Sequence, residues 1–529
     1  MAKFNTTRAR PAATSPVQTD ANASGLTYEG GPGYARDVQS ELFLLAVANM
    51  VGEDTFYEKA ADRDDRYSAL VRQVAVADPD WTLGFITWLR GEANMRSASL
   101  VAAAEAVKAR LAAASTNGVG NRQLVSAAMQ RADEPGEFLA YWMSRYGRAL
   151  PKPVKRGVSD AIGRLYTERA LLKYDTGSKG FRFGDVIDLV HPTSDTPEVG
   201  QRYEYALDRR HDRDKPIPAA LGVVRRNAEL RARAAQDPSV LLDAELLRGA
   251  GMTWEDVLSL AGSQLDKAQL WSALIPSMGI MALARNLRNF DEAGVADSVA
   301  EQVAAKFADP AQVARSRMFP FRWLSAYEAA PSLRWGHALD QALQASLQNL
   351  PAMPGRSLIL VDTSGSMTSG GISARSNVTP LKAAAVFGVA LAARGEQVDL
   401  HGFADGVFGH TVAKGASVIR EVAAFVERSG EVGHGTAIVP SLQATYHGQD
   451  RVFLISDMQT MAGPYSVGVS DVVPAHVPLY GFNLGGYKHA AYATGTANRH
   501  EFGGLTDATF RMVPLLEAGR AGVWPWLAE

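Results

Sequence analysis

The chain has 529 residues and a formal net charge of −2 at pH 7, with 47% hydrophobic and 21% charged residues. This length predicts roughly two or three domains, and a chain so close to neutral is no polycation, so any contact with nucleic acid requires a local basic patch. The sequence contains no cysteine, which excludes disulfides, thiolate catalysis and cysteine-based metal centres and agrees with a cytoplasmic location.

Residues 1–27, MAKFNTTRARPAATSPVQTDANASGLT, begin with basic side chains and continue with Ser, Thr, Pro and Ala. This stretch lacks the apolar core of a secretory signal, and no window of the chain reaches the roughly 18 apolar residues that span a bilayer. We therefore expect residues 1–27 to form a disordered tail, or a flexible arm that contacts a partner, on a cytoplasmic protein.

Helical spacing of apolar residues dominates residues 28–350. The first segments that show it are VQSELFLLAVANMV, YSALVRQVAVA, WTLGFITWLRGEA and ASLVAAAEAVKARLAAA, with short breakers between them. Each expected helix spans roughly 10–17 residues and each connection is short, a pattern typical of antiparallel helix pairs stacked into a solenoid. Because no fixed period recurs, the repeats are HEAT-like only in this general sense.

The helical pattern continues through MTWEDVLSLAG, AQLWSALIPSMGIMALARNLRNF and LRWGHALDQALQASLQNL. We expect Pro320 to start or bend a helix, because proline has no backbone N–H to donate. The segment PAMPGR at residues 351–356 then combines two prolines with a glycine, and the periodicity changes after it. We place the domain boundary there, with a helical domain over 28–350 and a second domain over 351–529.

Strand and helix patterns alternate in this second domain. The apolar runs SLILVD, QVDLHGFAD, RVFLISD and HVPLYGFNLGG indicate strands, and TFRMVPLL closes the series. Amphipathic segments between them, such as PLKAAAVFGVALAARG and ASVIREVAAFVERSG, indicate helices. This order predicts a doubly wound, Rossmann-like parallel α/β sheet, in which ligands bind at the carboxyl ends of the strands.

Five oxygen-bearing side chains fall in the loops at the expected carboxyl ends of these strands. They are Asp362, Ser364 and Ser366 in DTSGSM, Thr436 in GHGTAI and Asp457 in FLISDMQ. Alternating residues in an extended stretch point to one side, and carboxylate and hydroxyl oxygens are hard ligands that together carry little charge. Such a set suits Mg²⁺ or another divalent cation and leaves room for an anionic ligand.

This ordered set resembles the metal-ion-dependent adhesion site of von Willebrand factor A domains. Two other interpretations stay open: the residues only form caps and turns, or the site exists without a role. We interpret His434, close to Thr436, as a solvent-facing loop residue. Because the sequence offers no arrangement of a nucleophile beside a general base, we interpret the site as one for binding and expect the chain not to be an enzyme.

A local excess of Lys and Arg over Asp and Glu lies between about residues 145 and 235. The aromatic residues interleaved with it are Tyr166, Tyr174, Phe181, Phe183, Tyr203 and Tyr205. Cations that pair with phosphates and rings that stack on unpaired bases are the two components of single-stranded RNA binding. The alternative is a solvated helix face whose charges pair with neighbouring acids such as Glu168 and Asp208.

Three further segments make the sequence similar to the Ro RNA-binding proteins, whose helical module is called TROVE. They are KRGVSDAIGRLYTERALLKYDTGSKGFRFGDVIDLVHP (155–192), IPSMGIMALARNLRNFDEAGV (275–295) and RSRMFPFRWLSAY (315–327). The resemblance is to the bacterial branch and extends over nearly all residues from about 30 to 529. It includes the order of a helical module followed by a von Willebrand A domain.

The resemblance implies a ring of helical repeats whose ends are bridged by the A domain. In this family, single-stranded 3′ ends of misfolded RNAs enter the basic centre of the ring, and Y RNA stem-loops bind its outer rim. Bacterial relatives act with exoribonucleases such as polynucleotide phosphorylase. The implied partners are therefore a Y-like small RNA, single-stranded RNA ends and an exoribonuclease. The resemblance also implies that the protein is a monomer and acts in RNA quality control as part of a ribonucleoprotein.

The same resemblance assigns RNA contacts to individual residues. Lys173 and Tyr174 match a family KY pair whose lysine contacts Y RNA. The family has an arginine four residues after this lysine, where this sequence has Gly177. We expect Lys179 or Arg182 to substitute for that arginine. A lysine supplies a point charge to a phosphate, whereas an arginine supplies a forked set of donors.

The other candidates for RNA contacts are Lys155, Arg156, His191, Arg285 and Arg288. His191 matches another contacting position of the family, although a histidine before a proline after an apolar run is also typical of a loop start. Arg285 and Arg288 lie in MALARNLRN, a motif typical of the family, where Asn286 and Asn289 equally suit helix packing.

Three functions are compatible with these observations, and the one we favour is non-catalytic RNA binding. The second is a protein-binding scaffold that is metal-dependent because its A-domain site captures a carboxylate from a partner. The third is a subunit of a metal-chelatase or ATPase-partner complex, which the TROVE-like segments disfavour.

Overall fold

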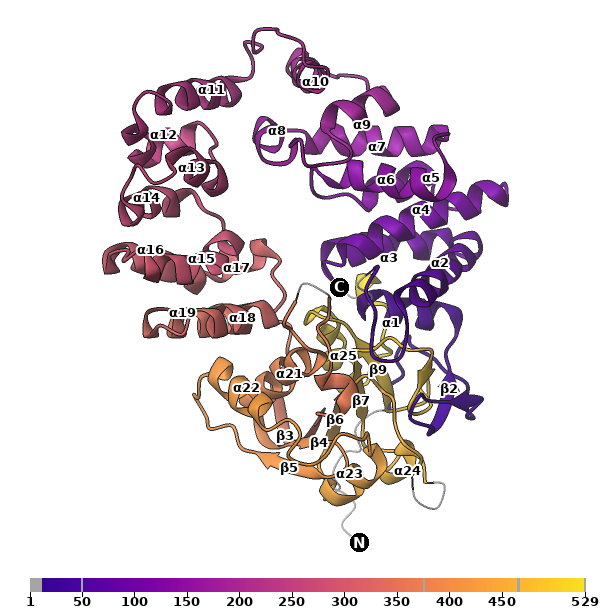
Figure 1. The fold of residues 1–529 in the computed structure, drawn as a ribbon. Helices are drawn as coiled ribbons and strands as arrows, with labels where there is room; N and C mark the ends of the chain where they lie inside the picture. The colour runs from indigo at the N-terminus through magenta and orange to yellow at the C-terminus, as the bar shows by residue number, and fades with distance from the viewer. Residues whose placement is uncertain (1–11, 49–50, 374–375, 464–466, 528–529) are drawn as a thin grey trace.

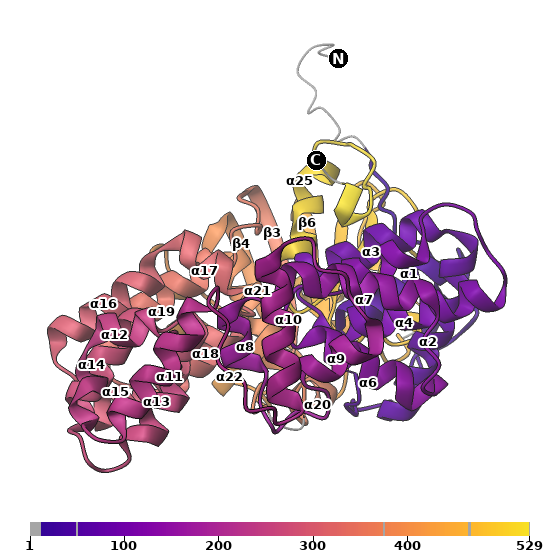
Figure 2. The same ribbon diagram turned by 90° about the horizontal axis from the view of Figure 1, so that it is seen from above.

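The computed structural model describes residues 12–48, 51–373, 376–463 and 467–527. Its helices form an arc whose two ends both meet an α/β domain, so the ribbon forms a ring in Figure 1. Figure 2 shows the ring from above, with α1–α4 on one side and α12–α16 on the other. This is the predicted architecture, an all-α HEAT-like ring followed by a doubly wound α/β domain.

The first arm of the arc runs from α1 to α10. Its helices are α1 (Val38–Ala48), α2 (Ala60–Ala77), α3 (Pro79–Gly91), α4 (Arg96–Ala112), α5 (Asn121–Ala127), α6 (Glu134–Tyr146), α7 (Lys152–Leu165), α8 (Glu168–Tyr174), α9 (Phe183–Val190) and α10 (Pro197–Arg210). Prolines at the first positions of α3, α6, α7 and α10 begin these helices, because the N–H that proline lacks has no partner there. The small side chains of Ala102–Ala104 are fully buried and let neighbouring helices approach α4 closely.

The second arm runs from α11 to α19. Its elements are α11 (Gly222–Ala234), η1 (Pro238–Leu242), α12 (Ala244–Gly249), α13 (Trp254–Ala261), α14 (Lys267–Leu274), η2 (Ile275–Ser277), α15 (Ile280–Glu292), α16 (Asp297–Ala308), α17 (Pro310–Ser316), α18 (Phe321–Ala329) and α19 (Leu333–Ala345). The side chains of Asp243, Thr253 and Asp309 accept backbone N–H bonds at the starts of α12, α13 and α17. Pro320 directly precedes α18, which confirms the helix start expected at this residue.

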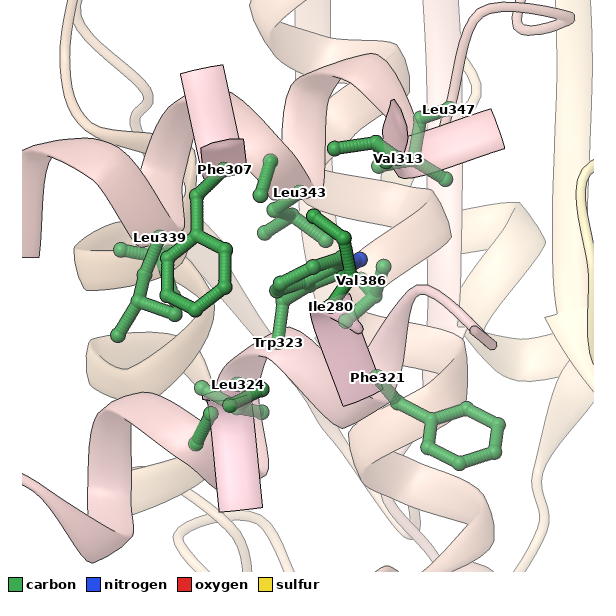
Figure 3. Close-up of a cluster of buried hydrophobic side chains, with 14 of the residues drawn as sticks. Ile280, Phe307, Val313, Phe321, Trp323, Leu324, Leu339, Leu343, Leu347 and Val386 are labelled. Carbon is green, nitrogen blue, oxygen red and sulfur yellow. The ribbon is translucent and has the colours of Figure 1, made fainter. Parts of the chain in front are cut away.

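The hydrophobic core of the second arm continues into the α/β domain. Figure 3 shows Trp323 of α18 among buried side chains that include Phe307 and Leu343 from the same arm and Val386 from the α/β domain. The first arm has a separate core, against which Trp524 and Trp526 pack near the end of the described chain. The second arm and the α/β domain therefore share one interior, whereas the first arm has its own.

The α/β domain is built on a six-stranded sheet with the order β5-β4-β3-β6-β7-β9. Its strands are β3 (Met353–Asp362), β4 (Gly395–Phe403), β5 (Val407–His410), β6 (Arg451–Ser456), β7 (Leu479–Asn483) and β9 (Arg499–Gly503). The other elements of the domain are α20 (Gly365–Thr368), α21 (Pro380–Arg394), α22 (Val418–Glu427), α23 (Ile438–Thr445), α24 (Val469–Val472), β8 (His489–Ala490), η4 (Ala508–Arg511), α25 (Met512–Glu517) and η5 (Pro525–Leu527). The pairs β3–β4, β3–β6, β6–β7 and β7–β9 are parallel, and β5 lies antiparallel at the edge.

Three segments of the sheet domain differ from the sequence-based prediction. The antiparallel edge strand β5 was not predicted. The strand β9 was not predicted, because its residues Arg499, His500 and Glu501 are polar although the structure buries all three. The segment TFRMVPLL, expected to close the alternating series, folds as η4 and α25. The apolar runs that were assigned to strands form β3, β4, β6 and β7.

The expected disorder of the N-terminal tail does not hold for residues 12–27, and residues 1–11 lie outside the described part of the chain. Ala13 and Val17 are buried, with 4% and 1% of their surfaces exposed. The backbone N–H of Gly522 donates to the Thr14 carbonyl at 2.7 Å. The segment is ordered because the α/β domain supplies the apolar surface and hydrogen-bond partners that the segment itself lacks.

Contacts at both ends of the arc close the ring. Asp340 of α19 accepts hydrogen bonds from the Ser417 hydroxyl at 3.0 Å and the Ile419 N–H at 2.9 Å, which attaches the second arm to α22. The first arm is attached through the strand pair β2 (Pro32–Ala35) and β8 and by the buried ion pair of Arg36 with Glu501 at 2.6 Å. Among the described residues, no helix combines the length and apolarity required to cross a bilayer.

Candidate functional sites

The five residues expected to bind a metal are buried at one edge of the sheet. Asp362 ends β3, Ser364 precedes α20, Ser366 lies within α20, and Asp457 directly follows β6. Thr436 lies in the loop before α23. Because β3 and β6 are adjacent parallel strands, their carboxyl ends lie together. The exposed fractions of the five residues range from 0% for Asp362 to 5% for Ser366.

Hydrogen bonds hold these side chains in fixed positions. The Ser364 N–H donates to Asp362 Oδ1 at 2.9 Å, and the hydroxyls of Ser364 and Ser366 lie 3.2 Å apart. Ser456 donates from its hydroxyl to Asp362 Oδ2 at 2.5 Å. This bond joins the ends of β6 and β3, and the Ser366 hydroxyl lowers the pKa of Asp457, against the rise that burial causes.

The buried carboxyls of this group create an environment that favours a bound cation. Burial raises the pKa of Asp362 to about 6, and burial together with the charge of Asp362 raises the pKa of Asp457 to about 8. Within the described ranges, neither carboxyl forms an ion pair with Lys or Arg. The Thr436 hydroxyl is buried, and none of the described residues forms a hydrogen bond with it. Two buried carboxyls without a counter-charge and one unpartnered hydroxyl are the environment that a bound divalent cation would satisfy.

The donor set also limits which metals fit. The side chains offer only carboxylate and hydroxyl oxygens, which are hard ligands suited to Mg²⁺ and not the nitrogen and sulfur ligands that Zn²⁺ prefers. In the described part of the chain, no group of three or more His, Cys, Asp or Glu is arranged to hold a metal ion. The residues present therefore fit a cation that keeps part of its water shell, as Mg²⁺ does.

A second group of candidate residues surrounds the Tyr174 ring at the end of α8. The Lys173 Nζ lies 5.2 Å from the ring centroid, and the Arg131 guanidinium carbon lies 5.7 Å from it. Both distances allow cation–π attraction. Lys179 lines a small cavity of about 100 Å³ together with Tyr174 and Asp133. The structure thus brings Lys173, Tyr174 and Lys179 together in one cluster with Arg131.

Lys173 lies between the two arms of the ring. It lines a cavity of about 370 Å³ with Met278–Ala282, Gln312, Arg315 and Ser316, all of which belong to the second arm. Figure 1 shows α8 on the side of the first arm that is turned toward the second. Among the described residues, Lys173 and Arg315 have no hydrogen bond or ion pair with any acidic side chain. Two cations from different arms, neither in an ion pair within 4 Å among the described residues, therefore line one open cavity, although the charge of Arg315 contributes to the lowered pKa of Asp309.

Two other basic candidates are paired with acids. Lys179 lies 3.8 Å from Asp133. Arg182, which precedes α9, lies 3.4 Å from the fully buried Asp175, and its Nη1 donates to the Arg209 carbonyl at 3.3 Å. Both ion pairs are long, and the side chain of Lys179 remains 41% exposed, so a phosphate can compete for this lysine more easily than for Arg182.

The remaining candidates are distributed over other elements. Lys155 and Arg156 lie in α7, and His191 ends α9 with a left-handed backbone (φ 51°) and an exposed side chain. Arg285 and Arg288 are exposed on α15 in the second arm, where Arg288 pairs with Glu292 at 2.7 Å. The positive charge of Arg285, after burial, lowers the pKa of Arg322, which places those two cations near each other.

Asn286 and Asn289 form hydrogen bonds within their own helix, α15. Asn286 is buried and donates to the Ala282 carbonyl at 2.8 Å, and Asn289 donates to Asn286 at 2.8 Å.

Sequence reasoning missed Arg131 and Arg315, since both lie outside the basic region of residues 145–235. Their proximity to Lys173 follows from the closure of the ring, for which the sequence contains no local signal.

Comparisons with known proteins agree with this architecture. A family model described as the TROVE domain matches residues 249–335. The RNA-binding protein RO60 of Deinococcus radiodurans is 25% identical over 383 residues, which cover 67% of this chain and 68% of that protein. Telomerase protein component 1 of Mus musculus is 37% identical over 83 residues, so this chain spans 3% of the length of that relative.

A solved structure is similar over most of the molecule. The Deinococcus radiodurans RO (RSR) protein aligns with 91% of this chain and 100% of its own, with a TM-score of 0.60 and 20% sequence identity. At 20% sequence identity, this similarity shows a shared fold and no more. The match extends over both arms and the α/β domain, whereas the family model covers a part of the second arm.

Proposed function

We propose that this chain, which is similar to the bacterial Ro proteins and carries a TROVE match, binds RNA as a non-catalytic component of a ribonucleoprotein. The observation that carries this proposal is the cavity between the two arms, lined by Lys173 and Arg315. Unpaired cations are the natural partners of phosphate groups, and charge-assisted bonds to phosphate are stronger than neutral hydrogen bonds. Tyr174, which Lys173 contacts, adds an aromatic face on which a base can stack.

Within this proposal, a single-stranded 3′ end occupies the cavity between the arms. Lys173 lies there, although the resemblance alone assigned it to Y RNA. A Y-like stem-loop binds the other basic side chains of the first arm, which are Lys155, Arg156, Lys179, Arg182 and His191. Delivery of the RNA end to an exoribonuclease such as polynucleotide phosphorylase, in RNA quality control, completes the proposal.

The cation site has a structural role in this proposal. Asp362, Ser364, Ser366, Thr436 and Asp457 would hold Mg²⁺ directly or through its waters. The bound ion would neutralise the two buried carboxyls and fix the loops that carry them. RNA binding is then expected to be unaffected by Asp362→Ala, because the RNA-binding cations belong to the helical arms.

Substitution of the two unpaired cations tests the RNA proposal. We expect Lys173→Ala combined with Arg315→Ala to weaken binding of a stem-loop RNA with a single-stranded 3′ tail at least tenfold, as measured by fluorescence anisotropy. The slope of log affinity against log salt should fall by about 0.7 for each lost phosphate contact to a single strand. The matched control is Arg248→Ala, which removes an exposed arginine paired with Glu245 on α12. Wild-type affinity and salt slope in the double variant would refute the assignment.

A further inference from the structure

A small cavity in the first arm is lined by four aromatic side chains. They are Tyr166, which directly follows α7, Tyr174 at the end of α8, and Phe181 and Phe183 at the start of α9. The rings of Tyr166 and Phe183 stack with their centroids 3.8 Å apart and their planes 5° apart. The cavity has a volume of about 100 Å³ and also borders Lys179. We call this cavity the aromatic pocket.

Small side chains on α6 form the opposite wall of the aromatic pocket. Gly136 and Ala140 of this helix both line the cavity. A Cβ at Gly136 would lie 3.1 Å from the Phe181 carbonyl oxygen, so the absence of a side chain allows the loop of residues 179–181 to lie against the helix. Ala140 is only half-buried, and its single methyl group leaves the space between the helix and the rings open.

The aromatic pocket contains a buried polar group that has no partner. Tyr166 is 2% exposed, and none of the described residues forms a hydrogen bond with its hydroxyl. Buried hydroxyls are normally hydrogen-bonded, because a buried polar group without a partner destabilises the fold. The stacking on Phe183 fixes the direction of the Tyr166 ring. A ligand in the pocket with a hydrogen-bonding edge would supply the missing partner.

The charges at the edge of the aromatic pocket leave a lysine available. Both acids that line the cavity are paired with arginines: Asp133 accepts from Arg131 at 2.6 and 2.7 Å, and Glu137 pairs with Arg96. Lys179 lies farther from Asp133, at 3.8 Å, and its side chain is 41% exposed. Because the Arg131 guanidinium already neutralises Asp133, Lys179 can pair with a phosphate that arrives from solvent.

We propose that the aromatic pocket takes one unstacked base of the bound RNA, with the Tyr166 hydroxyl bonded to the base and Lys179 paired with a neighbouring phosphate. The inference rests on the RNA binding proposed above and adds a base contact to it. Pockets for drug-sized ligands have volumes of about 300–1,000 Å³, so a cavity of about 100 Å³ has room for one base and not for stacked pairs. The pocket therefore selects an unpaired nucleotide, whose base is free to leave the stack.

Two hairpin RNAs that differ only in their loops test the aromatic pocket. One has a single-stranded loop of ordinary nucleotides, and in the other the loop is abasic and keeps every phosphate. Stacking of one base on aromatic side chains strengthens binding by about 5- to 150-fold. We therefore expect the wild type to bind the loop with bases at least fivefold more tightly, as measured by fluorescence anisotropy. The ratio of the two affinities reports on the base and not on the phosphates.

Two substitutions in the aromatic pocket should reduce this ratio without changing affinity for the abasic RNA. Ala140→Leu fills the cavity with a residue of high helix propensity and should bring the ratio close to one. Tyr166→Phe should lower the ratio about fivefold by removing one hydrogen bond. It should not lower Tm, because none of the described residues bonds to that hydroxyl.

The matched controls make the same chemical changes elsewhere. They are Ala232→Leu, at an exposed residue of α11, and Tyr446→Phe in the α/β domain, and both should keep the wild-type ratio. If the wild type binds neither RNA, the proposed function itself is wrong. If the wild type binds both RNAs equally, or if Ala140→Leu and Tyr166→Phe keep the wild-type ratio, RNA binding stands and the aromatic pocket is refuted as a base site.

Discussion

At the scale of single residues, Asp362 and Asp457 make the stability of the α/β domain depend on pH. Burial raises the pKa of Asp362 to about 6. Burial and the charge of Asp362 together raise the pKa of Asp457 to about 8. Aspartates in an unfolded chain have a pKa of about 3.9. Between these values the folded, metal-free protein holds protons that the unfolded chain has released. Its free energy of unfolding therefore falls as pH rises from about 4 to about 8. A cation bound at the proposed site would remove this penalty by stabilising the ionised carboxylates.

This linkage predicts that Mg²⁺ stabilises the protein more at high pH than at low pH. At pH 8.5 a cation relieves the repulsion of two ionised carboxylates, whereas at pH 5.0 it must first displace protons. We expect the rise in Tm on adding Mg²⁺, followed by differential scanning fluorimetry, to be several degrees larger at pH 8.5. The pH dependence should disappear in Asp362→Asn, and an equal rise at both pH values in the wild type would contradict the prediction.

At the scale of the elements, α18 and α21 connect two modules through one interior. Trp323 of α18 is fully buried and lies beside Phe307 of α16 and Leu343 of α19, and the same cluster includes Val386 of α21. Close-packed interiors do not adjust to the loss of a large ring without leaving a cavity. The second arm is therefore expected to unfold together with the α/β domain and not before it.

The substitution Trp323→Ala tests this coupling. Removal of a buried tryptophan side chain should lower the free energy of unfolding by about 3–5 kcal/mol. Urea unfolding followed by far-UV circular dichroism measures the loss. Hydrogen exchange should show faster opening in both α19 and α21, and faster exchange in α19 alone would argue against a shared core. Leu333→Ala is the control, because Leu333 is 99% exposed in the same arm.

At the scale of the whole molecule, aromatic residues near the end of the described chain hold the first arm to the α/β domain. Trp524 and Trp526 stack on each other with centroids 5.5 Å apart. Trp526 contacts Trp81 of α3 at 5.1 Å, and Trp524 contacts Phe43 of α1 at 5.2 Å. Because the first arm does not share the core of the second, this aromatic contact and the pairing of β2 with β8 carry much of its attachment.

Loss of the aromatic contact should loosen the ring at one end. For Trp526→Ala we expect faster amide exchange in α1 and α3, no change in α15–α19, and a larger radius of gyration by small-angle X-ray scattering. Gly84→Val tests the same contact from the helix side, because a Cβ at Gly84 would lie 2.5 Å from the Trp526 ring. Val523→Ala, at a residue that is 37% exposed in the same segment, is the control and should leave both measurements unchanged.

The sequence by itself determined the features that depend on spacing within a segment. Helical periodicity located most helices of both arms, and apolar runs located β3, β4, β6 and β7. The alternation of Asp362, Ser364 and Ser366 at a strand end indicated one group of ligands because side-chain direction follows from local backbone geometry. Resemblance to a known family added the ring and the order of the domains.

Tertiary structure alone decided which distant segments meet. It ordered residues 12–27, buried the polar strand β9, placed Arg315 and Lys173 on one cavity, and brought Tyr28 to the loop after β6. Each of these outcomes depends on a partner that lies far away in the chain. The local secondary-structure propensity of a segment does not indicate such a partner, because the contact exists only after the arc of helices has closed on the α/β domain.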